Sequence, residues 1–196
     1  MTNLNFDKEN TALLVIDPYN DFVSEGGKVW DRIQRVAEAN DCMPHMLQLV
    51  NAARTAGLPV FYALHHRYRP GDYQTWKYIA PIQKAAWSLK TFEYGTWGGE
   101  IHKDFAPQAG DVVVQEHWGS SGFANTDLDL QLRKHGVHKL IVIGLLIPTR
   151  FCSSWFLRRK THTIPIFNRN IQKVCSFSRQ AGGRSGSNGV VRALIK

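Results

Sequence analysis

Acidic residues are missing from the last quarter of this 196-residue chain. The last of the 16 Asp and Glu is Asp129, whereas 10 of the 24 Lys and Arg lie within 149–196. The first 148 residues carry 14 bases against 16 acids, a net charge of −2, and the remainder carries +10. A change this abrupt marks a compositional boundary. We therefore expect one domain over 1–149 and a basic, poorly ordered tail over 150–196.

Cysteine is also scarce, and no targeting or membrane segment stands out. Three cysteines, an odd number, do not suggest a disulfide framework. No apolar run approaches the ~20 residues of a membrane span, and the first residues lack a basic segment followed by an apolar one. These absences predict a cytoplasmic protein with reduced thiols and no membrane association.

Short apolar runs alternate with helix-like segments. The runs typical of buried strands are 11–17, 58–64, 111–116 and 139–144. Segment 43–57 has apolar residues at helical spacing, and 125–136 predicts a second helix, which Asn125 or Thr126 would cap. Strands joined through helices pair in parallel with right-handed crossovers. The order predicts an α/β fold, a Rossmann-like doubly wound and mainly parallel sheet, incomplete on its C-terminal side because the alternation stops after 148.

Aromatic residues gather in one long segment that has neither strand nor helix periodicity. Residues 67–106 hold nine of the 22 aromatic side chains. A long aromatic loop in a compact domain is often a lid or a binding wall. The equally weighted alternative is a satellite hydrophobic cluster beneath the loop.

Polar residues follow two predicted strands at their carboxyl ends, where doubly wound sheets bind ligands. Asp17 ends the first strand and is a candidate general acid or base, although an Asp before a proline can also serve only a turn. Glu116 and His117 end the third, and both would face the crevice of Asp17 if the two strands are neighbours. Ser121 and Gly122 follow in a loop of small residues that lets the backbone approach a ligand.

Two further residues are candidates for substrate contact. Phe22 follows the first strand closely enough to line the crevice, and His65 ends the second strand. The side chains of His65 and the adjacent His66 would diverge on a strand, and the nearest acid is Asp72. We therefore predict no metal site and no cofactor.

Three ordered motifs resemble those of the isochorismatase-like cysteine hydrolases, a group that includes nicotinamidases. They are "ALLVIDPYNDF", "EHWGSSGFANTDLDLQL" and "HKLIVIGLL", and the resemblance covers roughly 11–148. It implies a site in which Asp, Lys and Cys come from successive crevice positions. In that scheme Cys attacks an amide or imidate carbon, Asp relays the proton and Lys supports the charge. Some isochorismate-cleaving relatives lack the Cys and use the Asp to protonate a vinyl ether.

Only part of that site carries over to this sequence. Asp17 matches the family Asp, but the Lys position falls on Glu116, which would form a like-charge pair with Asp17 and raise one pKa. Whether His117 replaces the Lys stays open. The Cys position falls on Arg150, which cannot act as a nucleophile. Cys152 lies two residues later, a rotation of about 200° at a helix start.

The sequence therefore predicts an isochorismatase-family hydrolase of a small planar acid, amide or vinyl ether. Its candidate catalytic residues are Asp17, Glu116 and Cys152, and without the family Cys water would add while Asp17 donates the proton. The alternative is a catalytically inactive binding or assembly module. A small-molecule substrate is the expected partner; the relatives often self-associate, so a homo-oligomer is also open. The basic tail carries no nucleic-acid-binding motif, and no such partner is predicted.

The motifs stop where the acids stop, near Pro148 or Thr149. A shifted reading frame, a retained intron or an alternative exon would explain both facts. Translating the coding DNA around codon 149 in the other frames tests this hypothesis, because a Cys-containing helix and strand should appear there.

Overall fold

The computed structural model describes residues 7–119, 121–145 and 172–173. Five strands, five helices and two short 3-10 helices occur in these residues. In chain order they are β1 (Thr11–Ile16), α1 (Asn20–Val23), α2 (Trp30–Ala39), α3 (Cys42–Thr55), β2 (Val60–Ala63), α4 (Pro81–Leu89), η1 (Trp97–Gly99), η2 (Lys103–Phe105), β3 (Val112–Val113), α5 (Leu128–Lys134), β4 (Lys139–Ile143) and β5 (Gln172–Lys173).

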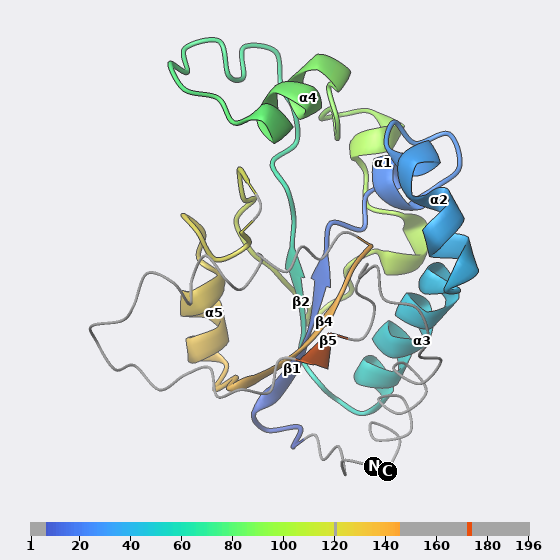
Figure 1. Cartoon of the computed structure of the whole chain (residues 1–196). Helices are drawn as coiled ribbons and strands as arrows, with labels where there is room; N and C mark the ends of the chain where they lie inside the picture. The colour runs from blue at the N-terminus through green and yellow to red at the C-terminus, as the bar shows by residue number, and fades with distance from the viewer. Residues whose placement is uncertain (1–6, 120, 146–171, 174–196) are drawn as a thin grey trace.

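The strands form one parallel sheet in the order β3-β2-β1-β4-β5 (Figure 1). From β1 the chain builds outward through β2 to β3, then returns to the other side of β1 to add β4. The predicted Rossmann-like, doubly wound parallel sheet is thus confirmed. The reversal of strand order between β1 and β4 is the place where such sheets bind ligands, outside the carboxyl ends of the strands.

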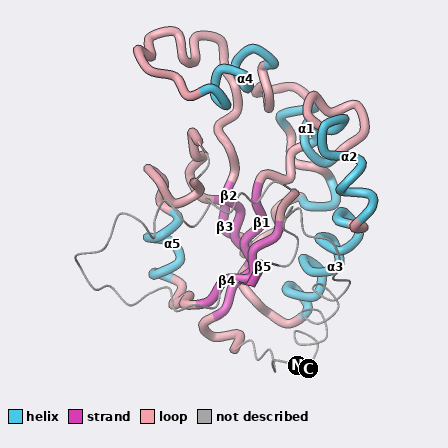
Figure 2. Tube along the Cα trace, in the orientation of Figure 1, coloured by secondary structure: helices cyan, strands magenta, loops and turns pink. Residues whose placement is uncertain are grey.

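Helices cover both faces of the sheet, with α2 and α3 on one side and α5 on the other (Figure 2). On β1, Leu13 and Val15 pack into the core beneath α2 and α3, whereas Leu14 packs toward Leu128 and Leu132 of α5. All six residues of β1 are buried. A strand buried on both faces needs a continuous apolar run, and such a run is why β1 could be predicted from the sequence.

Helix α5 begins later than predicted. Its N-cap is Asp127, whereas Asn125 has a positive φ of 58° and lies outside the helix. The prediction that Asn125 or Thr126 caps the helix is therefore wrong. The Thr126 hydroxyl still accepts a hydrogen bond from the backbone N–H of Leu128 (3.3 Å), so it stabilises the turn that leads into α5.

The aromatic segment 67–106 contains a helix that the sequence did not predict. Helix α4 starts with Pro81 in its first turn, where proline costs no backbone hydrogen bond. None of its residues is buried, so no apolar stripe against a core was present for periodicity to detect. In Figure 1, α4 lies beyond the carboxyl ends of β1 and β2.

The expectations for 150–196 lie outside the described residues, except at β5. Gln172 and Lys173 pair in parallel with Ile141 and Val142 at the edge of the sheet, a pairing that the sequence did not predict. Among the described helices, none has both the length and the apolar character that crossing a membrane requires.

Candidate functional site

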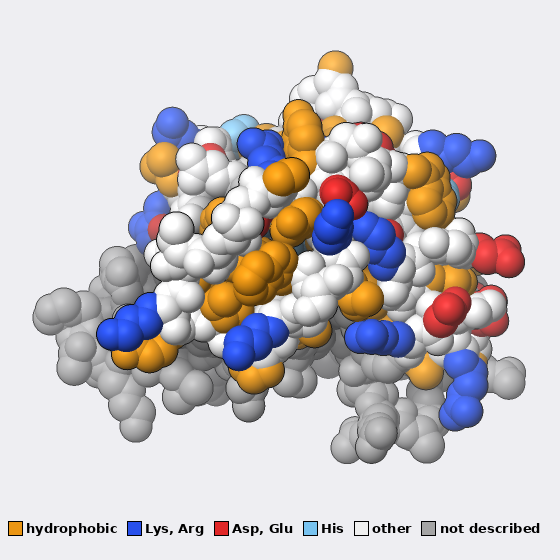
Figure 3. Space-filling view, turned by 90° about the horizontal axis from the view of Figure 1, so that it is seen from above, with side chains coloured by type: hydrophobic (Ala, Val, Ile, Leu, Met, Phe, Trp, Pro, Cys, Tyr) orange, Lys and Arg blue, Asp and Glu red, His pale blue; other side chains and the backbone are white. Residues whose placement is uncertain are grey.

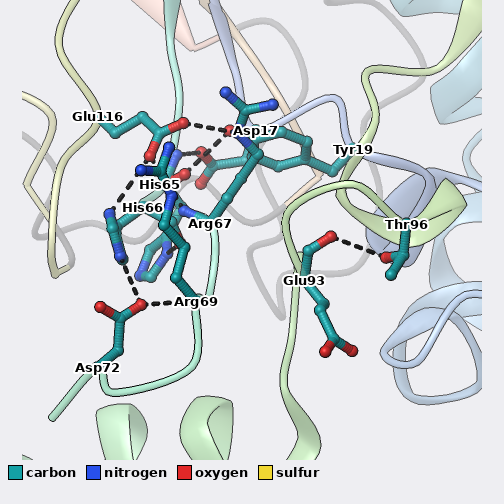
Figure 4. Close-up of polar contacts among 10 residues, drawn as sticks. All are labelled: Asp17, Tyr19, His65, His66, Arg67, Arg69, Asp72, Glu93, Thr96 and Glu116. Atoms are coloured by element: carbon teal, nitrogen blue, oxygen red, sulfur yellow. Dashed lines mark hydrogen bonds and ion pairs between the residues drawn. The ribbon is translucent and has the colours of Figure 1, made fainter.

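Asp17 lies directly after β1, at the switch point of the sheet. Its φ of 49° is in the left-handed region, which Asp tolerates better than most residues. One carboxylate oxygen, Oδ1, accepts a hydrogen bond of 2.6 Å from the backbone N–H of His65 at the end of β2. The turn after β1 thus directs the carboxylate across the end of the neighbouring strand, as Figure 4 shows.

His117 is the imidazole that faces Asp17. It extends β3, since its backbone N–H donates to the carbonyl of Leu64 and its side chain is buried. Nδ1 lies 2.6 Å from the carbonyl oxygen of Gly119, and Nε2 lies 3.4 Å from Oδ1 of Asp17. Both ring nitrogens face oxygen atoms that only accept hydrogen bonds, so this geometry favours the imidazolium.

The pKa of His117 responds to two opposing effects. Burial by itself lowers it, but the negative charge of Asp17 and the contact with that carboxylate outweigh burial, so the pKa of His117 is raised above its ordinary value. The strand ends thus bring a carboxylate and a favourably placed cation together. Of the two residues that the sequence offered as partners of Asp17, His117 rather than Glu116 lies next to it.

Glu116 points away to a different set of partners. It accepts two bonds from Arg67, from Nε to Oε1 at 2.7 Å and from the backbone N–H to Oε2 at 3.1 Å. Nδ1 of His66 lies 3.3 Å from Oε2 (Figure 4). Burial alone raises the pKa of Glu116, but these partners override it and bring that pKa down to about 2.

Two expectations about Glu116, made on the condition that it lies close to Asp17 on a neighbouring strand, are not met, and β2 lies between the two strands. A like-charge pair with Asp17 would have raised its pKa, and the opposite is found. Glu116 and His117 were also expected to face the same way, but consecutive side chains on an extended segment point to opposite sides. His117 consequently points toward Asp17, and Glu116 contacts Arg67 in the segment after β2.

His66 links this network to the aromatic loop. Its Nε2 lies 2.8 Å from Oδ2 of Asp72, so the ring bridges Asp72 and Glu116. Burial alone lowers the pKa of His66, and the two carboxylates outweigh burial and raise it. The same ring stacks on Trp118 with 3.5 Å between centroids. From the sequence, Asp72 was noted only as the acid nearest to His66 along the chain. The contacts of Arg67 and Trp118 with this network were not predicted.

His65 and Phe22 both pack against the ring of Phe92. The His65 ring packs edge-on to His117 at 5.2 Å and near Phe92 at 5.6 Å, and burial lowers its pKa. Phe22 meets Phe92 edge to face at 4.5 Å. The Tyr19 hydroxyl donates to the carbonyl of His65 at 2.9 Å, and burial keeps its pKa high, so it stays a neutral donor.

Ser121 and Gly122 shape the loop that follows. The Ser121 hydroxyl accepts from the N–H of Ala124 at 3.3 Å, and the carbonyl of Gly122 accepts from the Thr126 hydroxyl at 2.6 Å. Both residues are buried, so their contacts stabilise the turn before α5, and a substrate contact for either stays a prediction. Cys152 and Arg150 lie outside the described residues.

The aromatic loop is partly packed and partly exposed. Tyr73 is buried against Trp76, Trp87 and Trp118 with centroids 5.1–6.1 Å apart. Tyr78, by contrast, is 82% exposed. The part of the loop around Tyr73 therefore packs as a small aromatic cluster, which agrees with one of the two interpretations of segment 67–106. An open hollow of about 610 Å³ is lined by residues 76–80 and by Lys84.

No metal centre is visible in the part of the chain that the structure describes. Within 7–119, 121–145 and 172–173, no three His, Cys, Asp or Glu side chains are arranged to hold an ion. His65 and His66 diverge as expected, one toward His117 and the other toward Asp72.

The fold and the site together define an α/β protein with an acid–imidazole pair at its topological switch point. Residues 11–152 match the isochorismatase domain family. Because that match covers most of the chain, the protein belongs to the isochorismatase-like hydrolase family.

Curated relatives point to the same family. Ureidoacrylate amidohydrolase RutB of Pantoea ananatis is 28% identical over 165 residues, which cover 79% of this chain and 65% of that protein. The RutB of Yersinia enterocolitica is 30% identical over 164 residues, covering 78% and 70%. The chain thus spans about two thirds of the length of these relatives, and slightly less in the Pantoea protein.

Solved structures share the fold. A cysteine hydrolase from Pseudomonas syringae pv. phaseolicola has a TM-score of 0.64 at 23% identity, covering 97% of this chain and 85% of that one. An isochorismatase family protein from Desulfovibrio vulgaris has a TM-score of 0.58 at 25% identity, covering 76% and 75%. The Rossmann-like arrangement of this chain is therefore that of the family.

Proposed function

We propose that this chain hydrolyses a small-molecule amide or a related planar acid or vinyl ether, with Asp17 as the general acid and base. One observation carries the proposal: the Asp17 carboxylate lies at the switch point, fixed by the His65 N–H at 2.6 Å and faced by His117 at 3.4 Å. A carboxylate so placed can take a proton from water and return it to a leaving group.

His117 acts as the cationic partner that the family scheme assigns to Lys. Its hydrogen bond to Gly119 fixes the ring, and its second nitrogen presents positive charge to Asp17. That charge faces the carboxylate that exchanges the proton. It also stabilises negative charge as it develops on a nearby substrate oxygen.

The chemistry proceeds without a cysteine nucleophile, since Arg150 occupies the family position in the sequence. In the amide case, water adds to the carbonyl carbon while Asp17 accepts its proton. The carbon–nitrogen bond then breaks as Asp17 returns the proton to the leaving nitrogen, so the products are an acid and an amine or ammonia. In the vinyl ether case, the protonated form of Asp17 donates its proton to the double bond, and water adds to the resulting cationic carbon while its proton returns to Asp17. The carbon–oxygen bond of the hemiacetal or hemiketal then breaks, so the products are a carbonyl compound and an alcohol.

The relatives suggest which amide to test first. Two of them are named ureidoacrylate amidohydrolases, and a ureido group is an amide whose hydrolysis fits this scheme. Glu116 serves a positioning role here, because a carboxyl group with a pKa of about 2 is a poor proton carrier near neutral pH.

Turnover assays test this proposal directly. The purified chain is incubated with ureidoacrylate, nicotinamide and isochorismate, beside the Asp17→Asn variant. Turnover of at least one compound that is lost in the variant supports the proposal, whereas turnover that survives the substitution refutes the role of Asp17. Binding without any turnover favours the alternative, a catalytically inactive binding module, for which the Arg at the Cys position is the supporting observation.

A further inference from the structure

Two arginines share one tyrosine beside the site. Arg67 and Arg69 follow β2, and their guanidinium carbons lie 4.7 and 4.3 Å from the centroid of the Tyr94 ring. A guanidinium gains from the face of an aromatic ring, but placing two of them on a single ring brings like charges together. The sequence singled out neither arginine.

The backbone fixes this arrangement. The N–H of Tyr94 donates to the carbonyl of Tyr68 at 2.9 Å, so the segment that carries the ring is joined to the residue between the two arginines. Arg67 is held further by Glu116, through Nε at 2.7 Å. The ring and both charged groups are thus positioned before any ligand arrives, which lowers the entropic cost of binding one.

The positive charges of Arg67 and Arg69 are only partly neutralised by nearby carboxylates. Glu116 neutralises Arg67, but it also faces His66. The Arg69 side chain forms no ion pair with any residue in the described ranges; only its backbone N–H reaches Asp72, at 2.6 Å. A guanidinium has five N–H donors in a planar fork that matches a carboxylate. Most donors of this arginine pair are therefore available.

The cluster is both accessible and adjacent to the acid–base pair. Tyr94 is 53% exposed, and Arg67 retains 27% of its side-chain surface. Arg67 and Asp17 both act electrostatically on the Tyr19 hydroxyl, which donates to the carbonyl of His65, and Glu116, the partner of Arg67, is the residue before His117. The face at the carboxyl ends of the strands carries Lys and Arg side chains among hydrophobic ones (Figure 3), which suits a small anion with an apolar body.

We propose that Arg67 and Arg69, held over Tyr94, bind a carboxylate of the substrate and select small amides that carry a carboxylate a few bonds from the bond to be cleaved. This inference rests on the proposed function and narrows its substrate class. Asp17 and His117 perform the hydrolysis, while the arginine pair fixes the opposite end of the molecule. Ureidoacrylate meets this description, and nicotinamide, which has no carboxylate, does not.

Binding measurements separate this inference from the catalytic one. Calorimetric titrations at low salt compare ureidoacrylate with its methyl ester, which keeps the shape and loses the charge. The titrations use the Asp17→Asn protein, so that no turnover interferes, and they are repeated with Arg69→Gln, Arg69→Lys and the control Arg35→Gln. Arg35 is an exposed residue of α2 with no part in the site.

The acid should bind about 10- to 100-fold more tightly than the ester, because a charge-assisted hydrogen bond contributes that much. Arg69→Gln should weaken binding of the acid by a similar factor and leave the ester unchanged. Arg69→Lys should recover part of the loss, since it keeps the charge without the planar fork, and Arg35→Gln should change nothing.

Equal binding of acid and ester, absence of binding by both, or an unchanged affinity for the acid in Arg69→Gln would overturn the carboxylate site. Failure of the proposed function looks different. If the hydrolytic function is wrong but the carboxylate site is right, the wild-type chain binds ureidoacrylate in an Arg69-dependent way but releases no product.

Discussion

Two carboxylates at the ends of β1 and β3, the strands on either side of β2, have different surroundings in this molecule. Asp17 is contacted by one backbone N–H and one imidazole, at 2.6 and 3.4 Å. Glu116 is contacted by a guanidinium, a second imidazole and a backbone N–H. The first arrangement leaves an oxygen for chemistry, whereas the second uses the carboxylate to hold a loop. The number and kind of partners, rather than location at a strand end, decide which acid can react.

The largest effect should follow from Asp17→Asn. The amide can still accept the His65 N–H, so the fold should persist, but it cannot exchange a proton with water or a leaving group. We expect the turnover number to fall about 10²- to 10⁴-fold. Steady-state kinetics measure this, and Asp31→Asn on the exposed surface of α2 is the matched control. A drop of less than tenfold would remove Asp17 from the chemistry.

His117 variants test the cation next to Asp17. His117→Gln keeps a donor for the carbonyl of Gly119 and loses the charge, so we expect turnover to fall by about 10- to 100-fold. Because the active form is the imidazolium and its pKa is raised, activity should be present at lower pH and decline as pH rises through that pKa.

His117→Lys sharpens the same test. A lysine restores a positive charge whose ordinary pKa is about 10.4. Turnover should recover partly, and its alkaline decline should move to higher pH in a pH–rate profile. An unshifted profile would show that the titration of His117 does not control activity.

Glu116→Gln should act on stability more than on catalysis. Removing the charge weakens the contacts with Arg67 and His66, and we expect a loss of about 1–2 kcal/mol in unfolding free energy near pH 7, with turnover changed less than tenfold. The pKa of Glu116 is depressed in the folded chain, so its stabilisation is complete above its ordinary value of 4.5 and is lost as pH falls through about 2.

Denaturant unfolding at several pH values measures that loss. The difference between wild type and Glu116→Gln should be largest above pH 5 and should shrink toward pH 2. A turnover loss as large as that of Asp17→Asn would instead place Glu116 in the chemistry.

The sequence predicted the central strands and the place of Asp17, but it did not predict the partners of Glu116. After their first residues, Thr11 and Lys139, β1 and β4 are apolar and needed only length and flanking residues to be recognised, and Asp17 followed from its place after β1. The partners of Glu116 depend on the path of the segment after β2, which contains Tyr73 at a positive φ of 65°. Long-range loop geometry of this kind leaves no periodic trace in the sequence.

The side to which His117 and Glu116 point was predictable in principle. An extended backbone alternates its side chains, so only one of two consecutive residues could face Asp17. The isolated pairing of His65 with His117 carries β3 onward and sets that register. The choice between the two residues required knowing which of them lies on the side of Asp17, and β3, with only two residues, contains no apolar alternation that would reveal it.

The smallest expected effect concerns the outer end of the Glu116 network. Asp72 accepts hydrogen bonds from the His66 ring at 2.8 Å and from the N–H of Arg69 at 2.6 Å. Asp72→Asn keeps the shape and removes the charge opposite a protonated imidazole, so we expect a loss of about 0.5–1 kcal/mol in unfolding free energy. The pKa of His66 is raised in the folded chain, so this contribution is present below its ordinary value of 6.5 and is lost as pH rises through the folded value.

Histidine NMR and hydrogen exchange make that prediction specific. In Asp72→Asn the pKa of His66 should fall toward its ordinary value, and the Arg69 amide should exchange faster, while the pKa of His117 stays unchanged. Lys77→Gln, in the exposed part of the same loop, is the control. If the pKa of His117 moved together with that of His66, the two carboxylates would form one coupled site, and the separation between a reacting and an anchoring acid would not hold.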